Sequence, residues 1–122
     1  MTPIENEASV GLASGPLVAP VLGRVVGMLT ARADCPIDRL DDALLVADAI
    51  SAKAGSFSED GRVNVHVTAR IGSVELRVGP LRSGGAEELI ASAALPGVGN
   101  VLERVADVLD PQRNGSGDFL VI

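Results

Sequence analysis

The fold is most readily inferred from the stretch RVNVHVTARIGSVELRV, residues 62–78. Apolar residues take every second position in it, at 63, 65, 67 and 69 and again at 74, 76 and 78. This period of two, interrupted by the glycine-containing turn, predicts an antiparallel hairpin with strands over 62–69 and 73–78. One face of the hairpin is apolar and the other polar, so helices should cover the apolar face only. His66 falls on the polar face, where we expect a surface histidine rather than a metal ligand.

The residues before the hairpin predict two helices. Two stripes of apolar residues at helical spacing favour helices over 17–33 and 36–54. Asp34 or Cys35 could cap the second helix, and Gly55 should stop it. A short strand is expected before the first helix, at 8–13, and residues 1–7 should form a flexible N-terminus.

The residues after the hairpin predict two more helices and a last strand. The expected segments are a helix over 86–94, a helix over 98–109, a turn-rich linker over 110–117 and a strand over 118–122. The order of elements indicates an α+β fold, a two-layer sandwich of a mostly antiparallel sheet with helices on one face. Residues 8–122 should form one domain. Its expected core comprises Val25, Leu29, Leu44, Ala47, Val65, Val67, Leu76, Val78, Val101, Leu102 and Val105.

The composition argues against several classes of function. The 122 residues carry a net charge of −6, which disfavours nucleic acid as a partner, because such binding needs Lys and Arg on the phosphates. Phe57 and Phe119 are the only Phe, Tyr or Trp residues, so few aromatic rings are available to stack on nucleic-acid bases. The single cysteine excludes an internal disulfide and a multi-cysteine metal site. No apolar run is long enough to cross a membrane, and the acidic N-terminus does not look like a signal peptide, so we expect a cytoplasmic protein.

Three further stretches carry a family resemblance. They are LDDALLVADAISAKAG (40–55), VELRVGPLRSGG (74–85) and LPGVGNVLERVADVLD (95–110). In this order and spacing they resemble the histidine-kinase-like ATPase domain, in the small form of the bacterial anti-sigma-factor serine kinases. The resemblance runs from about residue 8 to residue 122. It implies the ATPase fold, with helices covering one face of the sheet.

The groups that the resemblance assigns to catalysis are mostly replaced. Asp48 matches the family's glutamate, a general base, and is one methylene shorter. Ala52 matches the asparagine that supplies an oxygen to Mg²⁺, and a methyl group supplies none. The aspartate that reads adenine would fall near Gly79 or Pro80, whose side chains accept no hydrogen bond. We therefore expect no metal site.

The glycine loop is the part of the resemblance that is best retained. Gly97, Gly99 and Asn100 match the loop that closes over the phosphates, and the resemblance makes them a vestigial phosphate site. A plain loop at the start of a helix is the alternative reading of the same residues.

These replacements imply a degenerate, non-catalytic relative of the anti-sigma-factor kinases. Such a pseudokinase would be a partner-switching module that regulates transcription by binding a sigma factor, an anti-sigma antagonist or a second copy of itself as a homodimer. It would need no cofactor. Two alternatives stay open: an active but divergent serine kinase or ATPase that uses ATP and Mg²⁺, with Asp48 as base, and a structural dimerisation domain.

Overall fold

The computed structural model describes residues 6–33, 37–58, 60–95, 99–114 and 117–122. In chain order the elements are β1 (Asn6–Ala13), α1 (Val18–Arg32), α2 (Ile37–Phe57), β2 (Arg62–Arg70), β3 (Ser73–Leu81), α3 (Gly85–Ser92), β4 (Ala94–Leu95), β5 (Gly99–Asn100), α4 (Val101–Val105), β6 (Asp110–Asn114) and β7 (Gly117–Val121). The predicted α+β class is confirmed. None of the helices in these ranges is long and apolar enough to cross a membrane.

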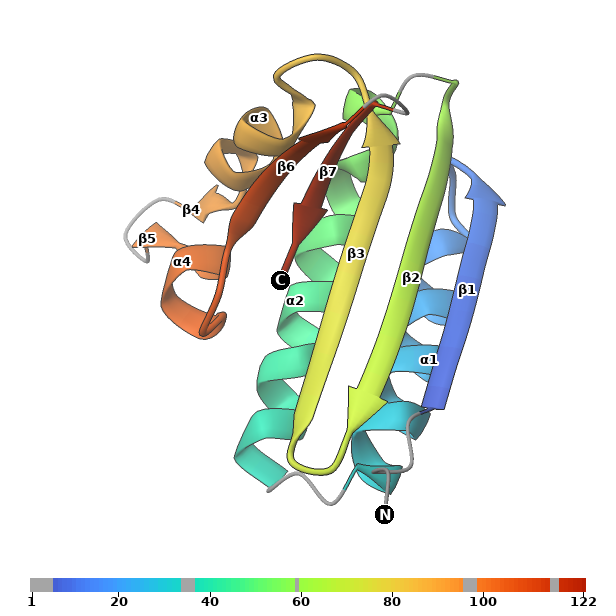
Figure 1. Ribbon diagram of the computed structural model, residues 1–122, viewed down its shortest axis with the longest axis vertical. Coiled ribbons are helices and arrows are strands. Elements are labelled where there is room, and N and C mark those ends of the chain that lie inside the picture. Colours follow the sequence, from blue (N-terminus) through green and yellow to red (C-terminus); the bar gives the residue numbers. More distant parts are fainter. Residues whose placement is uncertain (1–5, 34–36, 59, 96–98, 115–116) are drawn as a thin grey trace.

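A five-stranded antiparallel sheet forms one layer of the molecule. Its strand order is β1-β2-β3-β7-β6, and each neighbouring pair is antiparallel. The helices α1 and α2 run behind β1, β2 and β3, while α3 and α4 lie at the side of β6 and β7 (Figure 1). This arrangement is consistent with a two-layer sandwich. The short strands β4 and β5 pair with each other outside the main sheet.

The predicted hairpin is confirmed, including the face of each residue. β2 and β3 pair with Val65 opposite Val78 and Val67 opposite Leu76, and all four of these side chains are buried. Of the polar residues that alternate with them, Asn64, His66 and Arg77 are half-buried and Glu75 is exposed, whereas Thr68 is buried. The alternation set by a pleated strand therefore separates an inner apolar face, which packs on α1 and α2, from an open polar face.

The second helix does not stop at Gly55, as its sequence suggested, but runs to Phe57. Gly55 serves close packing instead. A Cβ atom at this position would lie 2.0 Å from Oγ of Ser14, just after β1. The predicted caps Asp34 and Cys35 lie outside the described residues.

The helix expected over 98–109 is much shorter. α4 spans five residues and ends at Val105, because Ala106 is extended with ψ 139°. The chain then turns back, and Asp110–Asn114 forms β6 on β7 where a linker was expected. Val105 and Leu109 still pack partly buried on the core, whereas Val108 is 57% exposed. The apolar spacing over 98–109 thus identified residues that pack on the core, but these residues are not all helical.

Most of the expected core is confirmed. Ala47, Val65, Val67, Leu76, Val78 and Leu102 are buried. Val25, Leu29 and Val105 are half-buried and pack against this core, whereas the expectation was wrong for Leu44 and Val101, which are half-buried outside it. On α2 the buried face runs through Val46, Ala47, Ile50 and Ala54, so Leu44 lies at its margin.

Candidate functional site

Asp48 and Ala52 lie one helical turn apart on the outer side of α2. Both are exposed, because the neighbouring Ala47 and Ile50 point into the core. Residues adjacent in a helix are rotated by about 100°, so position 48 faces away from that core. The Asp48 carboxylate forms no hydrogen bond or ion pair with the described residues. The pair offers one carboxylate and no second oxygen-bearing side chain, which is too few ligands for a Mg²⁺ site.

Gly79 and Pro80 lie near the end of β3, at a register shift in its pairing with β7. Side chains alternate along a strand, so position 79 faces the same side as Arg77. Gly79 indeed lines a shallow hollow on the open face together with Arg77 and Phe119. A carboxylate at position 79 would therefore point away from α2 and from Ala52.

Gly79 also has no room for any side chain. Its φ is +147°, a conformation that L-residues rarely adopt. A Cβ atom there would lie 2.6 Å from Cδ2 of Phe119 and 2.8 Å from the carbonyl oxygen of Asp118. An aspartate at this position would therefore have no room, since β7 occupies the space that its side chain would need.

Asn100 joins two helices through both ends of its amide group. Its Oδ1 accepts a hydrogen bond from the Glu103 amide nitrogen at 3.2 Å and so caps α4. Its Nδ2 donates to the carbonyl oxygen of Ile90 at 2.6 Å, close to the end of α3. Gly99 has φ +94°, which favours glycine, and Gly97 lies outside the described residues. The side chain of Asn100 is therefore committed to structure rather than free for a phosphate.

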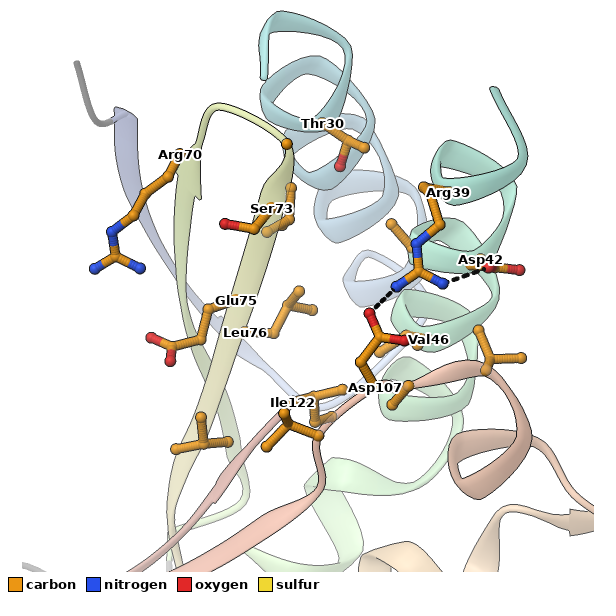
Figure 2. A pocket seen from close by; sticks show the side chains of 17 residues that line it. Thr30, Arg39, Asp42, Val46, Arg70, Ser73, Glu75, Leu76, Asp107 and Ile122 are labelled. Atoms are coloured by element: carbon orange, nitrogen blue, oxygen red, sulfur yellow. Dashed lines mark hydrogen bonds and ion pairs between the residues drawn. The ribbon is translucent and has the colours of Figure 1, made fainter. Parts of the chain in front are cut away.

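A second, more enclosed cavity lies elsewhere (Figure 2). It has a volume of about 340 Å³ and lies between the N-terminal half of α2, the first half of β3 and the segment that follows α4. Arg39 closes one side by pairing with Asp42 at 3.1 Å and with Asp107. Of the residues singled out in the sequence as site residues, none of those that the structure describes lines it. No single stretch of sequence signals this cavity, because its walls come from segments far apart in the chain.

The open face of the sheet carries an ordered set of polar side chains. Oγ of Ser9 lies 2.7 Å from Nδ1 of His66, and Nε2 of His66 lies 3.3 Å from Oε1 of Glu7, so this chain ties β1 to β2. On β3 the Arg77 guanidinium sits 4.4 Å from the centre of the Phe119 ring and donates to Oε1 of Gln112 at 3.1 Å. The side chain of His66 is 42% exposed, which confirms it as a surface strand histidine.

Three further findings concern metal ligands and relatives of this chain. Among the residues with described positions, no group of three or more His, Cys, Asp or Glu side chains could hold a metal ion. Comparison of the sequence with protein-family models gives no match. Comparison with curated proteins gives no match either.

Proposed function

We propose that this chain is a non-catalytic regulatory module of the anti-sigma-factor kinase type, which acts in the cytoplasm by binding another protein. The observation that carries the proposal is the packing of Gly79 against Phe119 and Asp118. An adenine-reading carboxylate has no space at this position, and its direction would be wrong. A nucleotide site of the kinase type would therefore lack its base-reading group.

The surroundings of the other matched positions support the same conclusion. Ala52 offers no oxygen to Mg²⁺, so the charge of a triphosphate would have no metal partner there. Asn100 uses its amide to hold α3 and α4 together. Asp48 is exposed and would retain the carboxylate of a general base, but no bound nucleotide would lie beside it.

The open face supports self-association as the second part of the proposal. One row across the face carries Glu7 and Glu75, and the next row carries His66 and Arg77. A two-fold axis between two copies, sheet against sheet, would place each acidic row over a basic row. The homodimer would leave the helical layer free for a sigma factor or an anti-sigma antagonist.

Two measurements separate this proposal from its alternatives. Titration of the protein with ATP and Mg²⁺ should give no binding heat, whereas a divergent kinase or ATPase would bind. Sedimentation together with a bacterial sigma factor and its antagonist should show a complex, whereas a purely structural dimerisation domain would form only the homodimer.

A further inference from the structure

The two outer strands of the five-stranded sheet differ in how well they resist pairing with a further strand. β6 carries charges at Asp110 and Arg113 and a proline at position 111, all of which discourage such pairing. β1 has neither a charge nor a proline between Ala8 and Ala13, and it pairs with β2 along all eight of its residues without a bulge. Among the strands that the structure describes, none lies on the outer side of β1. A straight, uncharged strand of this kind can accept another strand.

An apolar stripe of α1 lies on the same side of the molecule. α1 packs behind β1 and β2, and α2 lies beside it, toward β3 (Figure 1). Gly27 is on the side of α1 that faces α2, because a Cβ atom there would lie 3.7 Å from a leucine of α2. At about 100° per residue, the side away from α2 carries Val21, Val25 and Met28, and Leu17 directly precedes the helix. Leu17 and Met28 are 63% and 61% exposed.

β1 is self-complementary about a two-fold axis perpendicular to the sheet. In an antiparallel pair of two β1 strands centred at Val10, this residue would face its own counterpart, and Ala8 would face Leu12 of the second copy. These three residues lie on the inner face of the sheet, because each pairs with a buried valine of β2. The pair would therefore extend the sheet and keep its apolar face on the helical side.

The same axis would bring the two α1 helices together. The paired strands would lie about 4.8 Å apart, so helices packed behind β1 and β2 would be about 10 Å apart, close to the distance of packed helices. Val10 lies about 10 Å from the end of β1, and the axis would cross α1 at a similar distance from its start. Leu17 would then meet Met28 of the second copy, and Val21 would meet Val25. The exposed apolar stripe would thus be covered by itself.

Charge on the open face favours the same pairing. Glu7 would face Ala13 of the second copy, in the row that Arg62 occupies on β2. The Arg62 side chain leans over β1, since its Nη2 would lie 3.8 Å from a Cβ atom at Gly11. This guanidinium forms no ion pair with a described residue. It could reach across the small Ala13 to Glu7 of the second copy, and the two-fold axis would repeat this ion pair.

We propose that β1 and α1 form an edge-to-edge contact between two copies of this chain. The edge is about 27 Å long and about 20 Å deep through strand and helix, so it would bury about 500 Å² on each copy. This area is near the lower limit for a specific interface, so the association is weak and depends on concentration. The contact goes beyond the proposed function, whose dimer uses the open face. Both contacts together would give assemblies larger than a dimer.

Sedimentation equilibrium of the full chain tests the helical part of the contact. Met28→Glu places a charge in the apolar stripe and should weaken association about ten-fold or more. Leu45→Glu is the matched control, because Leu45 is 48% exposed on α2, away from this edge, and its replacement should leave association unchanged. A parent protein that stays monomeric at high concentration, or a Met28→Glu variant that associates as the parent does, would overturn the proposal.

An exchange of charges tests the register of the two strands. Glu7→Arg and Arg62→Glu should each weaken association about three- to ten-fold, because each variant sets like charges in one row. The two changes in one chain restore opposite charges and should recover the association of the parent. A double variant that remains as weak as the single variants would overturn the pairing centred at Val10.

The variants also separate this contact from the dimer of the proposed function. Association that is lost in Arg77→Glu but retained in Met28→Glu would overturn the edge contact and leave the sheet-against-sheet dimer. The opposite pattern would support the edge contact and remove that dimer from the proposed function. Titration with ATP is independent of both contacts.

Discussion

Gly79 and Phe119 touch across the β3–β7 pair so closely that a Cβ atom at position 79 would lie 2.6 Å from Cδ2 of the ring. The same ring stacks under the guanidinium of Arg77, 4.4 Å from its centre. The glycine, the ring and the arginine thus form one packed unit on the open face. The unit occupies the place where the resemblance would put an adenine-reading aspartate.

This contact predicts a large cost for any side chain at position 79. Gly79→Ala should lower the free energy of unfolding by about 2–4 kcal/mol, because overpacking adds to an unfavourable φ. Gly72→Ala is the matched control, since Gly72 has φ +78° with open space around it and should show the conformational part alone. Urea unfolding of both variants measures the difference, and equal costs would show that the Phe119 contact does not matter.

The two hydrogen bonds of Asn100 predict a structural role for this residue. Asn100→Ala removes the cap of α4 and the bond to the Ile90 carbonyl, so it should cost about 1–2 kcal/mol of stability. Asn6→Ala, in the exposed first residue of β1, should cost much less. Urea unfolding would contradict this role if both asparagine variants were as stable as the parent.

The core predicts different costs for two leucines. Leu102 is fully buried, so Leu102→Ala should cost about 2–5 kcal/mol. Leu44 is half-buried at the margin of α2, so Leu44→Ala should cost about 1 kcal/mol. Thermal or urea unfolding decides this, and a cost at Leu44 equal to that at Leu102 would mean that the face of α2 is wrongly assigned.

The charge rows on the open face predict how a dimer would respond to mutation. Arg77→Glu places an acid in the basic row and should weaken self-association about ten-fold or more, as seen by sedimentation equilibrium. Arg24→Glu makes the same change of charge on the exposed side of α1 and should leave the association unchanged. A parent protein that stays monomeric at high concentration would remove the homodimer from the proposal.

The sequence was sufficient for the parts of the fold that depend on local pattern. The alternation over 62–78 determines the faces of β2 and β3 because each apolar side chain there reaches the same core. The helical stripes located α1 and α2 for the same reason. The prediction that α2 ends at Gly55 was wrong, because a glycine can mark either a helix end or a close contact. Only the position of Ser14 shows that Gly55 makes a close contact.

The C-terminal region depended on contacts that the sequence does not reveal. The residues of β6, including Pro111, are typical of a turn, and they become an edge strand only because β7 lies beside them. The stripe that suggested a helix to residue 109 could not show where the chain turns back. For the site, the sequence was enough to show that positions 52 and 79 carry no oxygen-bearing side chain. It could not show that position 79 faces the open side, or that Asn100 bridges two helices.

Titration calorimetry of the unmodified protein with ATP and Mg²⁺ distinguishes a non-catalytic module from an active kinase. The resemblance assigns two nucleotide contacts to positions 52 and 79 that Ala52 and Gly79 cannot make, and each would be worth roughly 1.5–3 kcal/mol, or together a factor of about 10²–10⁴ in affinity. We therefore expect no Mg²⁺-dependent binding, and Ala52→Asn alone should not restore it, because the adenine contact would still be absent. A dissociation constant below about 100 μM for the unmodified protein would contradict the account and favour an active, divergent kinase.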